Sequence, residues 1–175
     1  MSINKALINR IKCFVFDVDG VLTDGTVIAL ESGEQARSFN IKDGYAIEQA
    51  LRAGYMVAII SGGNQVGVHK RLSFLKIPHI YLGVKNKVDT LLEFCKLTGI
   101  SPSEILYAGD DMPDFEVMKQ VALPCSPADA SHQIKEISLY VSEKVGGNGF
   151  VRELIEMVMN KQGKWHNQQQ QNINN

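Results

Sequence analysis

The sequence lacks an excess of charge of either sign. It has 18 Lys and Arg residues against 19 Asp and Glu residues, so the formal net charge is -1. A nucleic-acid-binding domain normally carries a basic face or a high pI, so we expect no nucleic-acid partner. No apolar run approaches the roughly 20 residues that a membrane span needs, and none at the N-terminus resembles a signal peptide. We therefore expect a cytoplasmic protein with no membrane partner.

Cysteine is also scarce. Cys13, Cys95 and Cys125 are odd in number and scattered, without the spacing that is typical of a metal site. A free cysteine packs as a small apolar residue, and thiols stay reduced in the cytoplasm. We interpret all three as buried free thiols.

Length and composition fit one globular domain. The chain has 175 residues, of which 45% are hydrophobic and 21% are charged, close to globular averages. This size suits one hydrophobic core and leaves little room for a second domain. We predict a single domain over residues 1–163. The polar tail of residues 164–175 has almost nothing to bury, so we expect it to be disordered.

Apolar runs that alternate with helical patterns predict the fold. The predicted strands are residues 12–16, 56–60, 79–82, 105–108, 121–125 and 139–141, and the predicted helices are residues 43–53, 64–75 and 86–97. This alternation is typical of βαβ units, so we predict an α/β fold with a doubly wound parallel sheet. Residues 26–39 depart from it and predict a β-hairpin inserted after the first strand.

Acidic side chains follow two of the predicted strands. Asp17 and Asp19 come directly after the first strand, and Gly20 permits a sharp turn there. The strand over 105–108 runs into the acidic segment 109–114, with the sequence GDDMPD. Ligands of open α/β sheets bind outside the carboxyl ends of the strands. Carboxylates gathered there would repel one another without a cation, and oxygen-only ligands favour Mg²⁺.

A hydroxyl and a lysine complete the pattern. Ser61 and Gly62 follow the strand over 56–60 and precede a predicted helix, where a hydroxyl and free amides can hold a phosphate oxygen. Lys87, near the start of its own helix, can offset the charge of a phosphoryl group. A solvated acidic loop, a helix-capping serine or a surface lysine would explain each signal by itself. Their combination in this order indicates a phosphate site.

The order of these segments resembles the haloacid dehalogenase superfamily of phosphotransferases. The segments are DVDGVLTD at 17–24, IISG at 59–62, Lys87 and GDDMPD at 109–114. The likeness covers about residues 12–159. The flanking segments 39–45 and 146–149 are similar to those of superfamily phosphatases that act on phosphorylated sugar acids in lipopolysaccharide synthesis, and the resemblance favours the phosphate of an eight-carbon sugar acid as substrate.

The resemblance implies an aspartyl-phosphate mechanism. Asp17 would be the nucleophile, and Asp19 would protonate the leaving group and later deprotonate the attacking water. The Mg²⁺ ligands would be the Asp17 carboxylate, the main-chain carbonyl of Asp19 and the Asp110 carboxylate.

The remaining motif residues have supporting roles in this family. Asp111 and Asp114 would orient Lys87 or metal-bound waters. Ser61 and Lys87 would stabilise the transferring phosphoryl group.

Neither gap between the motifs can house a cap domain. Residues 24–61 contain only the hairpin and one helix, and residues 61–87 contain a helix, a strand and a turn. The chain therefore resembles the capless class, in which tetramers gather their hairpins centrally and a neighbour completes each site. The apolar segment 27–30 favours such a contact. The alternative is a hairpin folded over its own core.

Candidate contacts for the sugar lie in two places. They are Lys42, Asp43 and Gly44 in an expected loop, and Arg71, whose fork matches the carboxylate of a 2-keto acid. An exposed helix arginine is equally common as plain surface. Asn148 stands where many relatives have arginine. Gly63 stands where some phosphatases for a nine-carbon sugar acid carry glutamate, which favours the eight-carbon substrate.

Three alternatives remain open at this point. One is a phosphatase for a nine-carbon sugar acid phosphate or a broader range of sugars. Another is a non-catalytic tetramerisation module, although such a module tends to lose some motif residues and this chain keeps them. The last is a phospho-aspartate receiver domain, in which Asp19 would promote unwanted hydrolysis.

Overall fold

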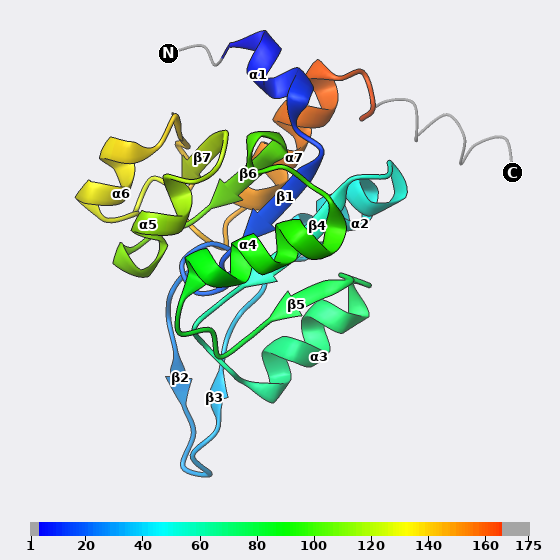
Figure 1. Cartoon of the computed structure of the whole chain (residues 1–175). Helices are drawn as coiled ribbons and strands as arrows, with labels where there is room; N and C mark the ends of the chain where they lie inside the picture. The colour runs from blue at the N-terminus through cyan, green and yellow to red at the C-terminus, as the bar shows by residue number, and fades with distance from the viewer. Residues whose placement is uncertain (1–3, 166–175) are drawn as a thin grey trace, which may run out of the picture.

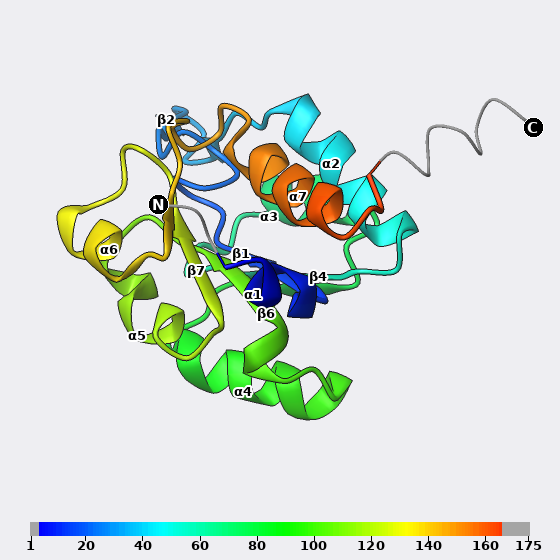
Figure 2. The same ribbon diagram turned by 90° about the horizontal axis from the view of Figure 1, so that it is seen from above.

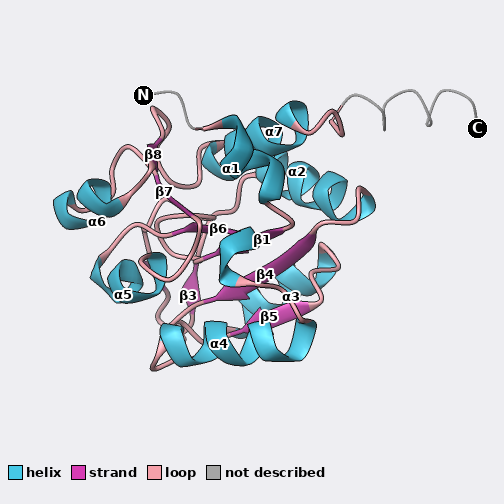
Figure 3. Ribbon diagram, turned by 45° about the horizontal axis from the view of Figure 1, so that its top comes forward, coloured by secondary structure: helices cyan, strands magenta, loops and turns pink. Residues whose placement is uncertain are grey.

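The computed structural model describes residues 4–165. Six parallel strands form one sheet in the spatial order β5-β4-β1-β6-β7-β8, which lies between layers of helices (Figures 1 and 3). The strands are β1 (Cys13–Phe16), β4 (Met56–Ile60), β5 (His79–Tyr81), β6 (Ile105–Ala108), β7 (Leu123–Ser126) and β8 (Tyr140–Val141). The predicted doubly wound α/β fold is confirmed.

Helices cover both faces of the sheet, as Figure 2 shows. One face carries α1 (Lys5–Arg10), α2 (Ile41–Arg52), α3 (Val66–Phe74) and α7 (Phe150–Lys161), and the other carries α4 (Lys87–Thr98), α5 (Phe115–Met118) and α6 (His132–Ile137). Successive side chains of β1 point to opposite faces of the sheet. Phe14 and Phe16 belong to the core cluster on one face, and Cys13 and Val15 belong to the cluster on the other. Short 3₁₀ turns occupy Pro102–Glu104 and Met112–Asp114.

The strand order reverses at the centre of the sheet. From β1 the chain proceeds through β4 to β5 on one side, and it then returns through β6 to β7 and β8 on the other. The carboxyl ends of β1 and β6 therefore flank the topological switch point, where open α/β sheets bind ligands.

The predicted hairpin is confirmed and stands apart from the sheet. It consists of β2 (Ile28–Ala29) and β3 (Gln35–Ala36), which pair only with each other (Figure 1). The side chains of Val27, Ile28 and Leu30 are 42%, 56% and 45% exposed. The alternative that the hairpin folds over its own core is therefore wrong. Across residues 4–165 no inserted unit other than this hairpin lies between the motifs, so the chain carries no separate cap domain there.

Two expectations about the fold need correction. The sequence predicted three helices, and the structure has four more within residues 4–165: the short helices α1, α5 and α6 and the long helix α7. The expected disorder from residue 164 is wrong at its start: Trp165 is 9% exposed, and its ring lies edge-on to Tyr45 with the Arg152 guanidinium above it. The rest of the predicted tail, residues 166–175, lies outside the described residues. Among the helices that are described, none has the length and apolar character needed to cross a bilayer.

Helix α7 is anchored at its N-terminus by α2. Gly149, the N-cap residue of α7, has no side chain to cap the helix. The buried carboxylate of Asp43 instead accepts hydrogen bonds from the backbone N–H groups of Gly149 (3.3 Å) and Arg152 (2.8 Å). An anion at this end also interacts favourably with the helix dipole. One side chain thus joins α2 to the C-terminal part of the core.

Replacing Asp43 by Ala is expected to lower the free energy of unfolding by about 1–3 kcal/mol, because two buried N–H groups lose their acceptor. Chemical denaturation measures this change. Asp43→Asn keeps one acceptor oxygen and should lose less. An Asp43→Ala variant as stable as the wild type would contradict the anchoring role.

Candidate active site

The acidic residues of the first and third motifs meet at the switch point. Asp17 follows β1 and is 8% exposed, and Asp110 lies just beyond the end of β6. Gly20, with φ of +75°, leaves the space that Asp110 occupies, because a Cβ there would overlap the Asp110 carboxylate. The sequence places glycine at a position where the loop after β1 closely approaches the loop after β6.

Lys87 joins two of the carboxylates from the start of α4. Its Nζ donates to Asp17 Oδ2 at 2.6 Å and to Asp114 Oδ1 at 2.7 Å, and the lysine side chain is 6% exposed. Burial alone lowers the pKa of a lysine, but Asp17 and Asp114 outweigh it and hold the pKa of Lys87 above its ordinary value. Lys87 is therefore a buried cation inside the carboxylate cluster.

Asp114 is buried deeper than the other members of the cluster. Its Oδ1 also accepts a hydrogen bond from the Tyr107 hydroxyl at 2.7 Å. Burial and the neighbouring Asp17 raise the pKa of Asp114 above its ordinary value, while Lys87 opposes the rise. With two donors on one oxygen, Asp114 holds Lys87 in place, in agreement with the expected orienting role.

The cluster fits a divalent cation. Asp17, Asp110 and Asp114 each offer a carboxylate oxygen, and these oxygens lie within 4.8 Å of one another. Burial, followed by repulsion from Asp17 and Asp114, raises the pKa of Asp110 to about 7. Three carboxylates this close repel one another, and the single positive charge of Lys87 does not balance them. A set of ligands made only of oxygen atoms suits Mg²⁺ and related hard cations. Asp17 and Asp110 are the carboxylates that were predicted as metal ligands. The Asp114 carboxylate was not predicted as a ligand, but it lies close enough to belong to the same group.

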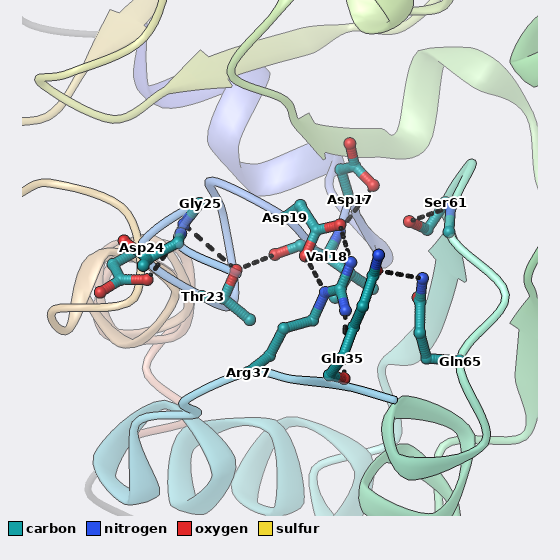
Figure 4. Close-up of polar contacts among 12 residues, drawn as sticks. Asp17, Val18, Asp19, Thr23, Asp24, Gly25, Gln35, Arg37, Ser61 and Gln65 are labelled. Atoms are coloured by element: carbon teal, nitrogen blue, oxygen red, sulfur yellow. Dashed lines mark hydrogen bonds and ion pairs between the residues drawn. The ribbon is translucent and has the colours of Figure 1, made fainter. Parts of the chain in front are cut away.

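Asp19 lies apart from the cluster, at the base of the hairpin. Figure 4 shows the Arg37 guanidinium facing the Asp19 carboxylate, with Nε–Oδ1 and Nη2–Oδ2 distances of 2.7 and 3.2 Å. The Asp19 side chain is 37% exposed, and the Arg37 side chain is 5% exposed. The structure thus gives the expected acid–base residue a bidentate partner that the sequence reasoning did not name.

Ser61 directly follows β4 and is 3% exposed. The backbone N–H of Gly63 donates to Ser61 Oγ at 3.4 Å. Helix α3 begins at Val66, two residues after its predicted start at residue 64. The amides near Ser61 belong to a loop over 61–65 and not to a helix N-terminus.

The sugar-contact candidates are distributed differently from the expectation. Residues 42–44 form the first turn of α2 and not a loop. Lys42 is exposed. The Asp43 carboxylate accepts a hydrogen bond from the backbone of α7. Gly44 is buried against Arg71, whose Nη2 would lie only 2.7 Å from a Cβ at position 44. Gly44 therefore makes room for Arg71 beside α2, and Asp43 serves the fold.

Two site residues were missed at the sequence level. Arg37 carries the only positive charge in the hairpin segment 26–39, which was a usable signal. Tyr107 lies within an apolar strand, and nothing in that pattern distinguishes its hydroxyl from those of other core tyrosines. The cluster Asp17, Lys87, Asp110 and Asp114 was correctly expected to gather at one edge of the sheet.

Comparison with known proteins agrees with this geometry. Residues 73–154 match the family model of haloacid dehalogenase-like hydrolases. The 3-deoxy-D-manno-octulosonate 8-phosphate phosphatase of Escherichia coli K12 is 37% identical over 155 residues, which cover 89% of this chain and 82% of that protein.

Solved structures show the same fold. The phosphatase of that name from Moraxella catarrhalis, in complex with a magnesium ion, a phosphate ion and KDO, has a TM-score of 0.87 and 33% identity over 90% of each chain. The cobalt-bound enzyme from Haemophilus influenzae has a TM-score of 0.87 and 32% identity, covering 90% of this chain and 92% of the other. With such relatives across most of its length, the chain belongs to the haloacid dehalogenase-like hydrolases and is a phosphoric monoester hydrolase.

Proposed function

We propose that this protein is a Mg²⁺-dependent phosphatase that hydrolyses 3-deoxy-D-manno-octulosonate 8-phosphate (KDO 8-phosphate) to the sugar acid and phosphate. The observation that carries the proposal is the buried Asp17–Lys87–Asp114 ion-pair cluster beside Asp110 at the switch point. Relatives of that name at 37% identity support the substrate. The three cysteines are free thiols, which agrees with a reducing cytoplasm, but Cys95 is only half-buried, so the expectation that all three are buried is wrong for that residue.

Asp17 acts as the nucleophile in the first half of the reaction. A carboxylate oxygen forms a bond to phosphorus as the bond from phosphorus to the sugar oxygen breaks, and Asp19 gives its proton to that oxygen. In the second half, Asp19 takes a proton from water. The water oxygen then bonds to phosphorus, and the bond to Asp17 breaks. This cycle returns both carboxylates to their starting forms.

Fixed donors hold the phosphoryl group during both halves. Lys87 is a buried cation at 2.6 Å from Asp17, so its charge lies where negative charge develops on the transferring oxygens. The Ser61 hydroxyl and the amides of the 61–65 loop face the same end of the sheet. Asp17, Asp110 and the main-chain carbonyl of Asp19 would hold Mg²⁺, which supplies charge neutralisation between nucleophile and phosphate.

Metal binding is expected to stabilise the fold. Millimolar Mg²⁺ added to EDTA-treated protein should raise Tm, because a ligand that binds only the native state at a hundredfold excess over Kd contributes about 2.7 kcal/mol. Without metal, the pKa of Asp110 is about 7, above its value of about 4 in the unfolded chain. The native state therefore binds more protons, and Asp110 costs stability increasingly as pH rises from about 4 to about 7.

Asp110→Asn separates this effect from general salt effects. The variant should lose the Mg²⁺-induced rise in Tm while its metal-free Tm is at least that of the wild type. Glu93→Gln, an exposed carboxylate on α4, should keep the full response. An Asp110→Asn protein that responds to Mg²⁺ like the wild type would show that the metal binds elsewhere.

A panel of phosphate esters tests the substrate. With Mg²⁺ present, kcat/KM for KDO 8-phosphate should exceed that for a nine-carbon sugar acid phosphate by about tenfold or more, and simple sugar phosphates should be poorer still. The opposite order would favour the nine-carbon alternative. No turnover of any ester would favour a non-catalytic tetramerisation module. Membership of the hydrolase family already removes the receiver-domain alternative.

We also propose that the protein forms a homotetramer in which a neighbouring copy completes each site. The site has no cap of its own within residues 4–165, and the apolar hairpin side chains Val27, Ile28 and Leu30 are exposed. Closure over the site excludes water from phosphoryl transfer.

Ile28→Glu is expected to dissociate the tetramer, because it places a charge in the hairpin contact, and to lower kcat/KM together with assembly. Light scattering and turnover measure the two effects. Leu97→Glu, at a side chain 73% exposed on α4, should change neither. A wild-type monomer with full activity would contradict the shared site.

A further inference from the structure

The two partners of the Arg37–Asp19 ion pair differ in how far they are exposed to solvent. The guanidinium side chain is 5% exposed, whereas the carboxylate side chain is 37% exposed. Two parallel hydrogen bonds of 2.7 and 3.2 Å fix the carboxylate in the plane of the guanidinium. Arg37 is therefore the buried member of the pair, and Asp19 is the member that solvent or a ligand can reach.

Three of the five N–H groups of Arg37 already have an acceptor in its own chain. Nε and Nη2 donate to Asp19, and Nη1 donates to the backbone oxygen of Gln35 at 3.4 Å. All three nitrogens therefore have an acceptor within the protein. A guanidinium that is buried and occupied in this way is poorly placed to receive a substrate carboxylate.

The pair places the Asp19 carboxylate beside the loop that follows β4. A Cβ at Gly63 would lie 3.6 Å from Asp19 Oδ2, so this carboxylate oxygen is next to the 61–65 loop. Gln35 also approaches this loop, because the Gln65 side-chain amide donates to Gln35 Oε1 at 3.4 Å (Figure 4). The hairpin therefore contacts both Asp19, through Arg37, and the 61–65 loop, through Gln35.

We propose that Arg37 is a positioning residue for the acid–base carboxylate of Asp19. It holds that carboxylate beside the 61–65 loop, so that the proton reaches the sugar oxygen as its bond to phosphorus breaks. Arg37 itself neither gives nor takes a proton. The inference rests on the proposed function, in which Asp19 transfers that proton. It assigns the hairpin a role in the chemistry of its own subunit, separate from any role in assembly.

Leaving groups of different basicity test this proposal. The sugar alkoxide of KDO 8-phosphate needs a proton, whereas the nitrophenolate of p-nitrophenyl phosphate leaves without one. A positioned acid contributes about 10²–10⁴-fold to rate. We expect Arg37→Ala to lower kcat for KDO 8-phosphate at least about a hundredfold with little change in KM, and to lower p-nitrophenyl phosphate turnover less than about tenfold.

Two further variants connect the effect to Asp19. Arg37→Lys keeps the charge but loses the fork, so it should recover only part of the rate. In an Asp19→Asn background, Arg37→Ala should cause little additional loss, because residues that act as one unit are not additive. Gln35→Ala is the matched control on the same hairpin and should leave the ratio of the two substrates unchanged.

The other outcomes overturn the inference in distinct ways. A rise in KM for KDO 8-phosphate at constant kcat would make Arg37 a substrate-binding residue. An equal loss on both esters, or the same loss in Gln35→Ala, would reduce it to a structural tether. Asp17→Asn tests the proposed function separately: if it retains turnover of both esters, the aspartyl-phosphate mechanism fails whatever Arg37 does.

Discussion

The site depends on gathering several carboxylates in one buried place without unfolding the protein. Lys87 makes this possible, because its ammonium group contacts Asp17 and Asp114 at 2.6 and 2.7 Å from the first residue of α4. Breaking a buried ion pair by removing one partner leaves an uncompensated charge and is strongly destabilising. The pair therefore joins β1, α4 and the segment after β6 at the point where the sheet topology reverses. In the proposed function the same cluster would take up a cation, because it is short of positive charge, and the bound cation would offset the negative charge of the phosphoryl group.

A division of labour follows from how deeply each carboxylate is buried. Asp114 is 1% exposed and holds Lys87, with help from Tyr107. Asp17 is 8% exposed, so it is open enough to meet a ligand while its charge is balanced by Lys87. Asp19 lies outside the cluster, more exposed than either, and pairs with a guanidinium instead. Under the proposed mechanism, these surroundings suit Asp114 to a structural role, Asp17 to nucleophilic attack and Asp19 to proton transfer.

Local patterns were sufficient to predict the strands and the main cluster. Strands β4 and β6 have their predicted bounds, because each is an apolar run that ends at Ser61 or Gly109. The cluster followed from the rule that ligands meet the carboxyl ends of parallel strands.

The parts that could not be predicted depend on contacts between distant segments. Asp43 looked like a loop residue near the sugar, but it anchors α7 more than 100 residues away along the chain. Arg37 and Asp19 are separated by 18 residues and meet only because the hairpin folds back. Trp165 is an apolar residue in a polar tail, and its burial required the position of α7. Periodicity reports which face of an element is buried, and it does not report which distant partner covers that face.

The central claim is that Asp17 carries the phosphoryl group during turnover. Rapid acid quenching of the enzyme during turnover of KDO 8-phosphate, followed by peptide mass spectrometry, tests it most directly. The account predicts a phosphoryl group on the peptide that contains Asp17, with slower decay in Asp19→Asn, since the base for the attacking water is lost. Turnover with no phosphorylated peptide, or with the phosphoryl group on another residue, would contradict it.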